Sequence, residues 1–230
     1  MRFDSAIPSR ATNAVENADF VISLSPFATE EMKAAADVLL PISPFSETSG
    51  TYINAEGSWQ SFAGAATPLA ETRPGWKVLR VLGNVFELEG FDFITSEDVR
   101  DEAKDKAGSL DTSNKMPWRC PTSLAQQPDN ISRIGVLPIY AVDGIVRRSG
   151  ALQETDDALP ACAIVNSETA KKNQIQDEDN VVVTQNSIKL KLRVHIEDSI
   201  PNNCVVIPQG VPGVGDFDAS YSEVTLSSKS

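Results

Sequence analysis

Histidine and cysteine are scarce in this sequence, and their scarcity limits the chemistry that it can support. The 230 residues include one histidine, His195, and three cysteines, Cys120, Cys162 and Cys204. Neighbouring cysteines lie about forty residues apart, which is neither the short spacing of zinc or iron–sulfur ligands nor an even disulfide framework. We therefore expect no metal site, no catalytic residue and no enzymatic activity of the chain by itself.

Long apolar runs and an excess of positive charge are also missing. No run approaches the roughly 18 apolar residues of a membrane-spanning helix, and the first residues lack the apolar core of a signal peptide. Lys and Arg total 20 against 32 Asp and Glu, and the net charge of −12 repels the phosphate backbone of nucleic acids. These absences predict no nucleic-acid partner, no direct membrane insertion and free thiols in a reducing, intracellular compartment.

What is present in the first half is an alternation of strand-like and helical segments. The apolar run 19–24 reads as a buried strand, and Thr29 with the acidic residues after it predicts a capped helix before a second apolar run at 38–40. Two short strands around a turn are predicted between 51 and 62, and helices are predicted over 74–88 and 95–107. The pattern predicts an α/β domain over residues 1–107.

The second half is dominated by β-type runs. Residues 108–134 are rich in Ser, Asn, Gln and Pro without periodicity, and we interpret them as a linker. Strands are predicted at 162–165, 180–184, 188–196 and 204–207, with a short capped helix over 167–172. A small β-barrel over residues 135–230 is the expected closure for these strands.

Three polar or glycine-rich features could carry function, and each also has a structural interpretation. His195 shares its strand face with Lys189, Lys191 and Arg193, so we expect it to be solvated. The glycines of 210–215 precede no helical pattern and predict a surface loop instead of a phosphate-binding turn. The polar segment 47–57 could line a ligand cleft, although a hydrogen-bonded turn is favoured on chemistry alone.

That polar segment belongs to a longer pattern that resembles the molybdopterin oxidoreductases. The matching stretches are 36–41 (ADVLLP), Glu47, 50–57 (GTYINAEG), Gln60 and 70–80 (AETRPGWKVLR). The stretches 138–148 (PIYAVDGIVRR) and 151–155 (ALQET) are similar to the large iron–sulfur subunits of bacterial NADH:quinone oxidoreductase, respiratory complex I.

The resemblance implies a partial Rossmann-like α/β domain followed by a small double-psi β-barrel. Thr51, Asn54, Glu56 and Gln60 would be vestigial positions of a pterin-binding loop, in which Ser58 stands where relatives usually have arginine. Because complex I relatives keep this fold without the pterin, we expect no cofactor in this chain. Iron–sulfur clusters are expected in an N-terminal part of the full subunit that carries the cysteine-rich motifs.

The function implied by the resemblance is that of a C-terminal structural and assembly module. It would support electron transfer from NADH to quinone without a cluster of its own, and its partners would be other peripheral-arm subunits of complex I. The expected location is cytoplasmic, at the cytoplasmic face of the inner membrane. The alternative is a cofactor-binding fragment of a molybdopterin enzyme such as a formate-dehydrogenase-like subunit.

Overall fold

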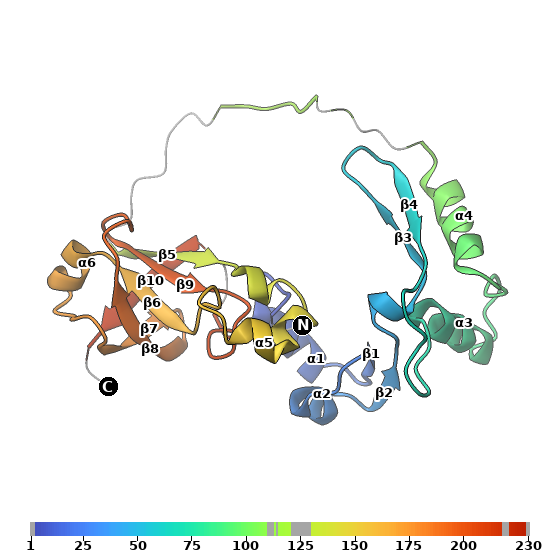
Figure 1. The fold of residues 1–230 in the computed structure, drawn as a ribbon, viewed down its shortest axis with the longest axis horizontal. Helices are drawn as coiled ribbons and strands as arrows, with labels where there is room; N and C mark the ends of the chain where they lie inside the picture. Colours follow the sequence, from blue (N-terminus) through green and yellow to red (C-terminus); the bar gives the residue numbers. More distant parts are fainter. Residues whose placement is uncertain (1–2, 110–112, 114, 121–129, 218–220, 229–230) are drawn as a thin grey trace. The chain divides into compact units, whose positions relative to one another are not determined.

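The chain forms two compact units in the computed structural model, which describes residues 3–109, 113, 115–120, 130–217 and 221–228 (Figure 1). One unit is Ala18–Thr122, and the other combines Met1–Asn17 with Ser123–Ser230. The N-terminal segment therefore belongs with the barrel, whereas the predicted domains placed it in the α/β part. Parts of the predicted linker, 110–112, 114 and 121–129, lie outside the described residues, and its end overlaps a barrel strand.

A parallel two-stranded sheet begins the first unit. Strand β1 (Ile22–Ser25) pairs with β2 (Val38–Pro41), and helix α2 (Glu30–Ala35) connects them. The helix begins as the sequence predicts, because the Thr29 hydroxyl accepts a hydrogen bond from the Met32 N–H at 3.3 Å. Parallel neighbours require such a crossover, so this is a βαβ arrangement.

An antiparallel hairpin and two helices complete this unit. The 3₁₀ turn η1 (Phe45–Glu47) leads into β3 (Gly50–Ile53) and β4 (Trp59–Phe62). Helices α3 (Gly75–Val85) and α4 (Ser96–Ala107) follow. In α4 the Thr95 hydroxyl and the Asp98 carboxylate form a reciprocal capping box, which explains why the helix begins there.

The second unit is a closed barrel of six strands in the order β10-β5-β9-β6-β8-β7. Its strands are β5 (Ile131–Val136), β6 (Cys162–Val165), β7 (Asn180–Gln185), β8 (Ile188–Ile196), β9 (Cys204–Pro208) and β10 (Tyr221–Ser227). Strand β10 pairs with β5 and with β7, so it closes the barrel. Closure leaves no free sheet edge, which is the usual benefit of this architecture. The predicted fold class, α/β followed by a β-barrel, is confirmed.

The barrel contains the described hydrophobic core. Alternate residues point inward, as in β7, where Val181 and Val183 are fully buried between more exposed neighbours. The segment after β9 contributes too, because Val211, Val214 and Phe217 are each less than 10% exposed. The prediction of a surface loop at 210–215 was therefore wrong in part: Val211 and Val214 pack into the core, whereas Pro212 and Gly213 between them are exposed.

The barrel unit also contains short helices. These are α1 (Pro8–Glu16), η2 (Ile139–Ala141), η3 (Val146–Arg148), α5 (Gly150–Gln153) and α6 (Ser167–Lys172). None of the helices in the described part of the chain is both long enough and apolar enough to cross a membrane.

Candidate functional site

The hairpin that carries the predicted loop positions is built around Asn54. The Asn54 side-chain oxygen accepts hydrogen bonds from the Glu56 N–H at 3.0 Å and the Ser58 N–H at 2.9 Å. Gly57 completes the turn with φ at 78°, a conformation that favours glycine. The amide oxygen of Asn54 is thus committed to holding the turn, in agreement with the structural interpretation of this segment.

The predicted loop positions do not converge on one cleft. Thr51 lies opposite Ser61, and their hydroxyl oxygens are 3.0 Å apart, whereas Gln60 lies opposite Tyr52. Adjacent strand residues point to opposite faces, so Thr51 and Gln60 are on different faces of the hairpin. Glu56 is exposed at the tip of the turn.

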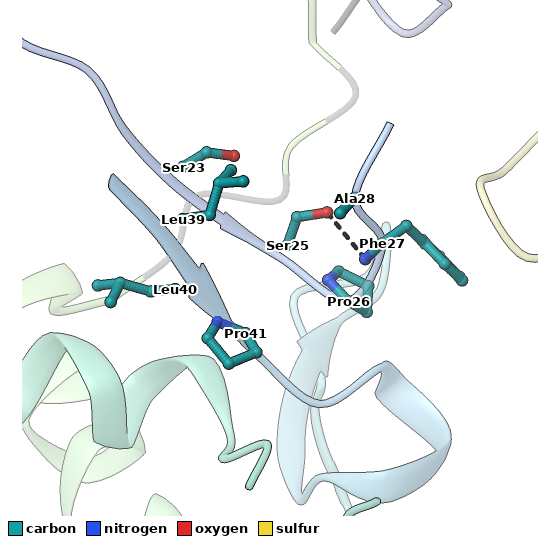
Figure 2. A pocket seen from close by; sticks show the side chains of 8 residues that line it. All are labelled: Ser23, Ser25, Pro26, Phe27, Ala28, Leu39, Leu40 and Pro41. Carbon is teal, nitrogen blue, oxygen red and sulfur yellow. Dashed lines mark hydrogen bonds between the residues drawn. The ribbon is translucent and has the colours of Figure 1, made fainter. Parts of the chain in front are cut away.

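A pocket of about 290 Å³ lies at the carboxyl ends of β1 and β2 (Figure 2). Its polar groups are the hydroxyls of Ser23 and Ser25, and the Ser25 hydroxyl accepts a hydrogen bond from the Phe27 N–H at 3.1 Å. The remaining lining residues are Pro26, Phe27, Ala28, Leu39, Leu40 and Pro41. Ligands of open α/β sheets bind at this end of the strands, which makes the pocket a candidate site that sequence reasoning missed.

A second polar cavity, of about 200 Å³, lies beside α6 at one end of the barrel. Its walls are tied by side-chain hydrogen bonds, among them Lys172 Nζ to the Asn203 side-chain oxygen at 3.1 Å and the Asn202 side-chain nitrogen to Glu168 at 2.6 Å. The buried Thr169 hydroxyl accepts a hydrogen bond from the Asn203 N–H at 3.0 Å. These groups mostly satisfy one another, although only Thr169 among them is buried.

The segment 138–153 forms a compact lobe beside the barrel, stitched by side chains that bind backbone groups. Gln153 donates to the carbonyls of Tyr140 at 3.0 Å and Val146 at 3.1 Å. Arg147 donates to the Ala141 carbonyl at 2.8 Å and, through its other terminal nitrogen, to both carboxylate oxygens of Asp4 at 2.9 and 3.1 Å. The N-terminal segment is anchored to the lobe by this ion pair.

His195 occupies the solvated strand face that its position predicts, with 42% of its side chain exposed. Its Nδ1 lies 3.0 Å from a carboxylate oxygen of Glu178, which also pairs with Arg193. Asp177 lies close by, and one ligand atom from each of Asp177, Glu178 and His195 falls within 4.8 Å of the others. Arg193 already forms an ion pair with Glu178, and the Asp177 carboxylate accepts a hydrogen bond from the Ile196 N–H at 2.9 Å. We therefore interpret these residues as an ion-pair network and not as a metal site.

The three cysteines remain thiols in different surroundings. Cys162 is buried in β6, and burial raises the pKa of its thiol because the thiolate would lose its hydration. Cys204 is partly buried, and Cys120 is exposed.

Two family models match the chain. Residues 4–85 match the molybdopterin oxidoreductase family, and residues 139–230 match the molydopterin dinucleotide binding domain. The chain is 26% identical over 220 residues to a subunit of the NADH-quinone oxidoreductase of Streptomyces coelicolor, and this alignment covers 90% of this chain and 25% of that protein. A Staphylococcus aureus protein named as a candidate formate dehydrogenase is 39% identical over 80 residues, 35% of this chain and 8% of the relative.

The solved acetylene hydratase from Pelobacter acetylenicus has a similar fold, with a TM-score of 0.59 and 16% identity. The likeness covers 89% of this chain and 35% of that structure. The chain therefore spans about a quarter to a third of the S. coelicolor relative and of this structural neighbour, and less than a tenth of the S. aureus protein.

These matches correct one prediction. We expected no cofactor in this chain, but both matching families point to a molybdopterin cofactor here. The donor set can be compared with such a group, whose dinucleotide form carries anionic phosphates. Arg147 already holds an oxyanion, the Asp4 carboxylate, so it fits the phosphate part of the ligand. Asn54 fits less well, because its side-chain oxygen is used within the turn.

Proposed function

Since this chain combines a segment of the molybdopterin oxidoreductase family with a molydopterin dinucleotide binding domain, we propose that it is one part of a larger oxidoreductase subunit. The larger subunit would be of the NADH-quinone oxidoreductase type. The observation that carries this choice is the similarity to the S. coelicolor NADH-quinone oxidoreductase protein, which runs through both units and covers 90% of the chain. The similarity to the candidate formate dehydrogenase covers only 35% of it.

Within such a subunit the barrel unit would hold the dinucleotide side of the cofactor. A pterin dinucleotide, when bound, supplies the ligands of a redox-active metal. In the barrel unit, Arg147 would bind and orient an anionic group of the ligand. Electron transfer from NADH to quinone would run through iron–sulfur clusters held outside this chain.

The proposal includes partners and a location. Other peripheral-arm subunits of complex I would contact this chain, on the cytoplasmic face of the inner membrane. A net charge of −12 would restrict which surfaces can pack against it, because like charges facing each other across an interface are unfavourable.

A second candidate function is supported by the higher local identity. Identity rises to 39% over 80 residues in the match to the candidate formate dehydrogenase. In that alternative the same residues would hold the cofactor of an enzyme that oxidises a small substrate, without NADH-dehydrogenase partners.

Affinity purification of the intact subunit that contains this chain separates the two functions. We expect the purified sample to reduce quinone with NADH and to contain other NADH-dehydrogenase subunits. Deletion of residues 131–228 should remove both the activity and the co-purifying subunits. Formate-dependent dye reduction without those partners would refute the assignment in favour of the alternative. Molybdenum, tungsten and the fluorescent product of pterin oxidation would be measured in the same sample, and their absence would refute the cofactor part of the proposal.

A further inference from the structure

The lobe at 138–153 contains two consecutive arginines, and the guanidinium group of each is held by a backbone carbonyl. Arg147 donates to the Ala141 carbonyl at 2.8 Å, and Arg148 donates to the Gly144 carbonyl at 2.8 Å. The side chain of Arg147 is only 13% exposed, and its guanidinium also lies 5.5 Å from the ring of Phe3. A guanidinium fixed by one N–H keeps its remaining donors in a defined direction, which suits the recognition of an oxyanion.

The carboxylate that pairs with Arg147 belongs to Asp4, a residue distant in the sequence. Asp4 is 143 positions from Arg147, and 53% of its side chain is exposed. The acidic residue of the lobe itself, Asp143, is engaged elsewhere, because it accepts the Ile145 N–H at 2.8 Å and the Val146 N–H at 2.9 Å. A mostly buried cation requires a nearby anion, and here an exposed side chain of the N-terminal segment supplies it.

We propose that Arg147 and Arg148 form a binding site for a phosphate or pyrophosphate group, and that the Asp4 carboxylate takes the place of the phosphate oxygens when no ligand is bound. The inference rests on the proposed function, because a dinucleotide carries such phosphates. Ion pairs with an exposed partner are weak and are screened by salt, so a multiply charged phosphate can displace Asp4. The overall charge of −12 would repel anions elsewhere on the surface, which makes local binding informative.

The test uses the whole chain and inorganic pyrophosphate as the probe. Binding is measured by titration calorimetry and by the shift in melting temperature, with NaCl added to the reference to match ionic strength. We expect Asp4→Asn to melt below the wild type in plain buffer, because the buried charge of Arg147 loses its partner. Pyrophosphate should restore the melting temperature of Asp4→Asn and bind it about tenfold more tightly than the wild type.

Removing the guanidinium groups should abolish the response. Arg147→Gln should show no saturable pyrophosphate binding, and Arg148→Gln should weaken it, whereas the matched control Arg10→Gln on α1 should bind like the wild type. Arg147→Lys keeps the charge but loses the planar fork, so it should bind more weakly than the wild type. This comparison remains available if Asp4→Asn does not fold.

Three results would overturn the inference. Equal binding by Arg147→Gln and the wild type would mean an adventitious ion only. A destabilised Asp4→Asn that pyrophosphate does not rescue would show that the site accepts only the carboxylate of the N-terminal segment. Absence of saturable binding in every variant would also reject the site. None of these results depends on metal content or NADH oxidation, so they are distinguishable from failure of the proposed function.

Discussion

Replacing Thr169 by valine tests whether the hydrogen bond between α6 and Asn203, the residue before β9, stabilises the barrel unit. Thr169 is 2% exposed, and its hydroxyl accepts the Asn203 N–H at 3.0 Å. The Asn203 carbonyl in turn accepts the Ser132 N–H at 2.8 Å, at the start of β5. Valine has nearly the shape of threonine, so the substitution removes the acceptor without leaving a cavity.

The expected loss of stability follows from the group that is left without a partner. An unsatisfied buried N–H costs about 1 to 3 kcal/mol, the Asn203 N–H is only partly buried and so falls in the lower part of this range, and the extra methyl of valine offsets up to about 0.8 kcal/mol. We therefore expect Thr169→Val to lower the free energy of unfolding of the barrel unit by about 1 kcal/mol. For a unit of this size that corresponds to a fall of roughly 3 to 6 °C in melting temperature.

The assay must report on the barrel unit itself. The three tryptophans, Trp59, Trp76 and Trp118, all lie in the other unit, so their fluorescence does not follow barrel unfolding directly. Urea unfolding is monitored by circular dichroism, which reports on both units, and by tryptophan emission, which reports on the α/β unit alone. Comparison of the two signals separates the unfolding of the two units. Thr169→Ser keeps the hydroxyl and serves as the control. If Thr169→Val unfolds at the wild-type urea concentration, the hydrogen bond is not a source of stability and the reasoning is refuted.

Three further changes have definite expected outcomes. Asn54→Ala should cost about 1 kcal/mol and speed amide exchange at Ser58, because the turn loses its acceptor; unchanged exchange would show that the backbone alone holds the turn. The hydrogen bond from the Thr95 backbone N–H is the largest cause that lowers the pKa of Asp98. The ionised Asp98 carboxylate therefore stabilises the fold fully above about pH 4, and this stabilisation is lost as the pH falls through the lowered pKa. Asp98→Asn should therefore flatten the acid side of the stability profile measured by urea unfolding, and an identical profile would contradict the capping role. Finally, Cys162 should react with a thiol reagent far more slowly than Cys120 in the native protein, and in Cys120→Ser its reaction should accelerate on unfolding; rapid native reaction of Cys162 would contradict its burial.

Features set by neighbouring residues could be predicted from the sequence. The Thr29 cap, the α4 start at Thr95 and the turn at Asn54 depend on contacts within a few positions, and the structure contains each of them. The polar face of β8 followed from strict alternation around His195.

Features that depend on distant partners could not be predicted in this way. Strands β5 and β10 gave no strong pattern of their own, and they become strands because each completes the barrel beside the other. The glycines of 210–215 predict a surface loop, yet Val211 and Val214 are buried in the core, because they pack against residues of distant strands that the local sequence does not reveal. The pocket beside β1 arises from the parallel pairing itself, which local composition does not reveal.

The candidate site residues also differ in whether the sequence could indicate them. The resemblance implies a place in the pterin-binding loop for Thr51, Asn54, Glu56 and Gln60, and their role in cofactor binding stays a prediction. The pairing of Asp4 with Arg147 could not be read from spacing, because no local pattern links residues 143 positions apart.

That separation has a consequence during synthesis on the ribosome. The segment around Phe3 and Asp4 is made well before its partner Arg147, which is added 143 residues later. At ordinary elongation rates the delay is on the order of ten seconds. During this time the whole of Ala18–Thr122 is made, while the early segment, with its 43% exposed Ile7, has no barrel to pack on. The barrel unit can therefore close and hold its N-terminal segment only after β10, its last strand, has been synthesised.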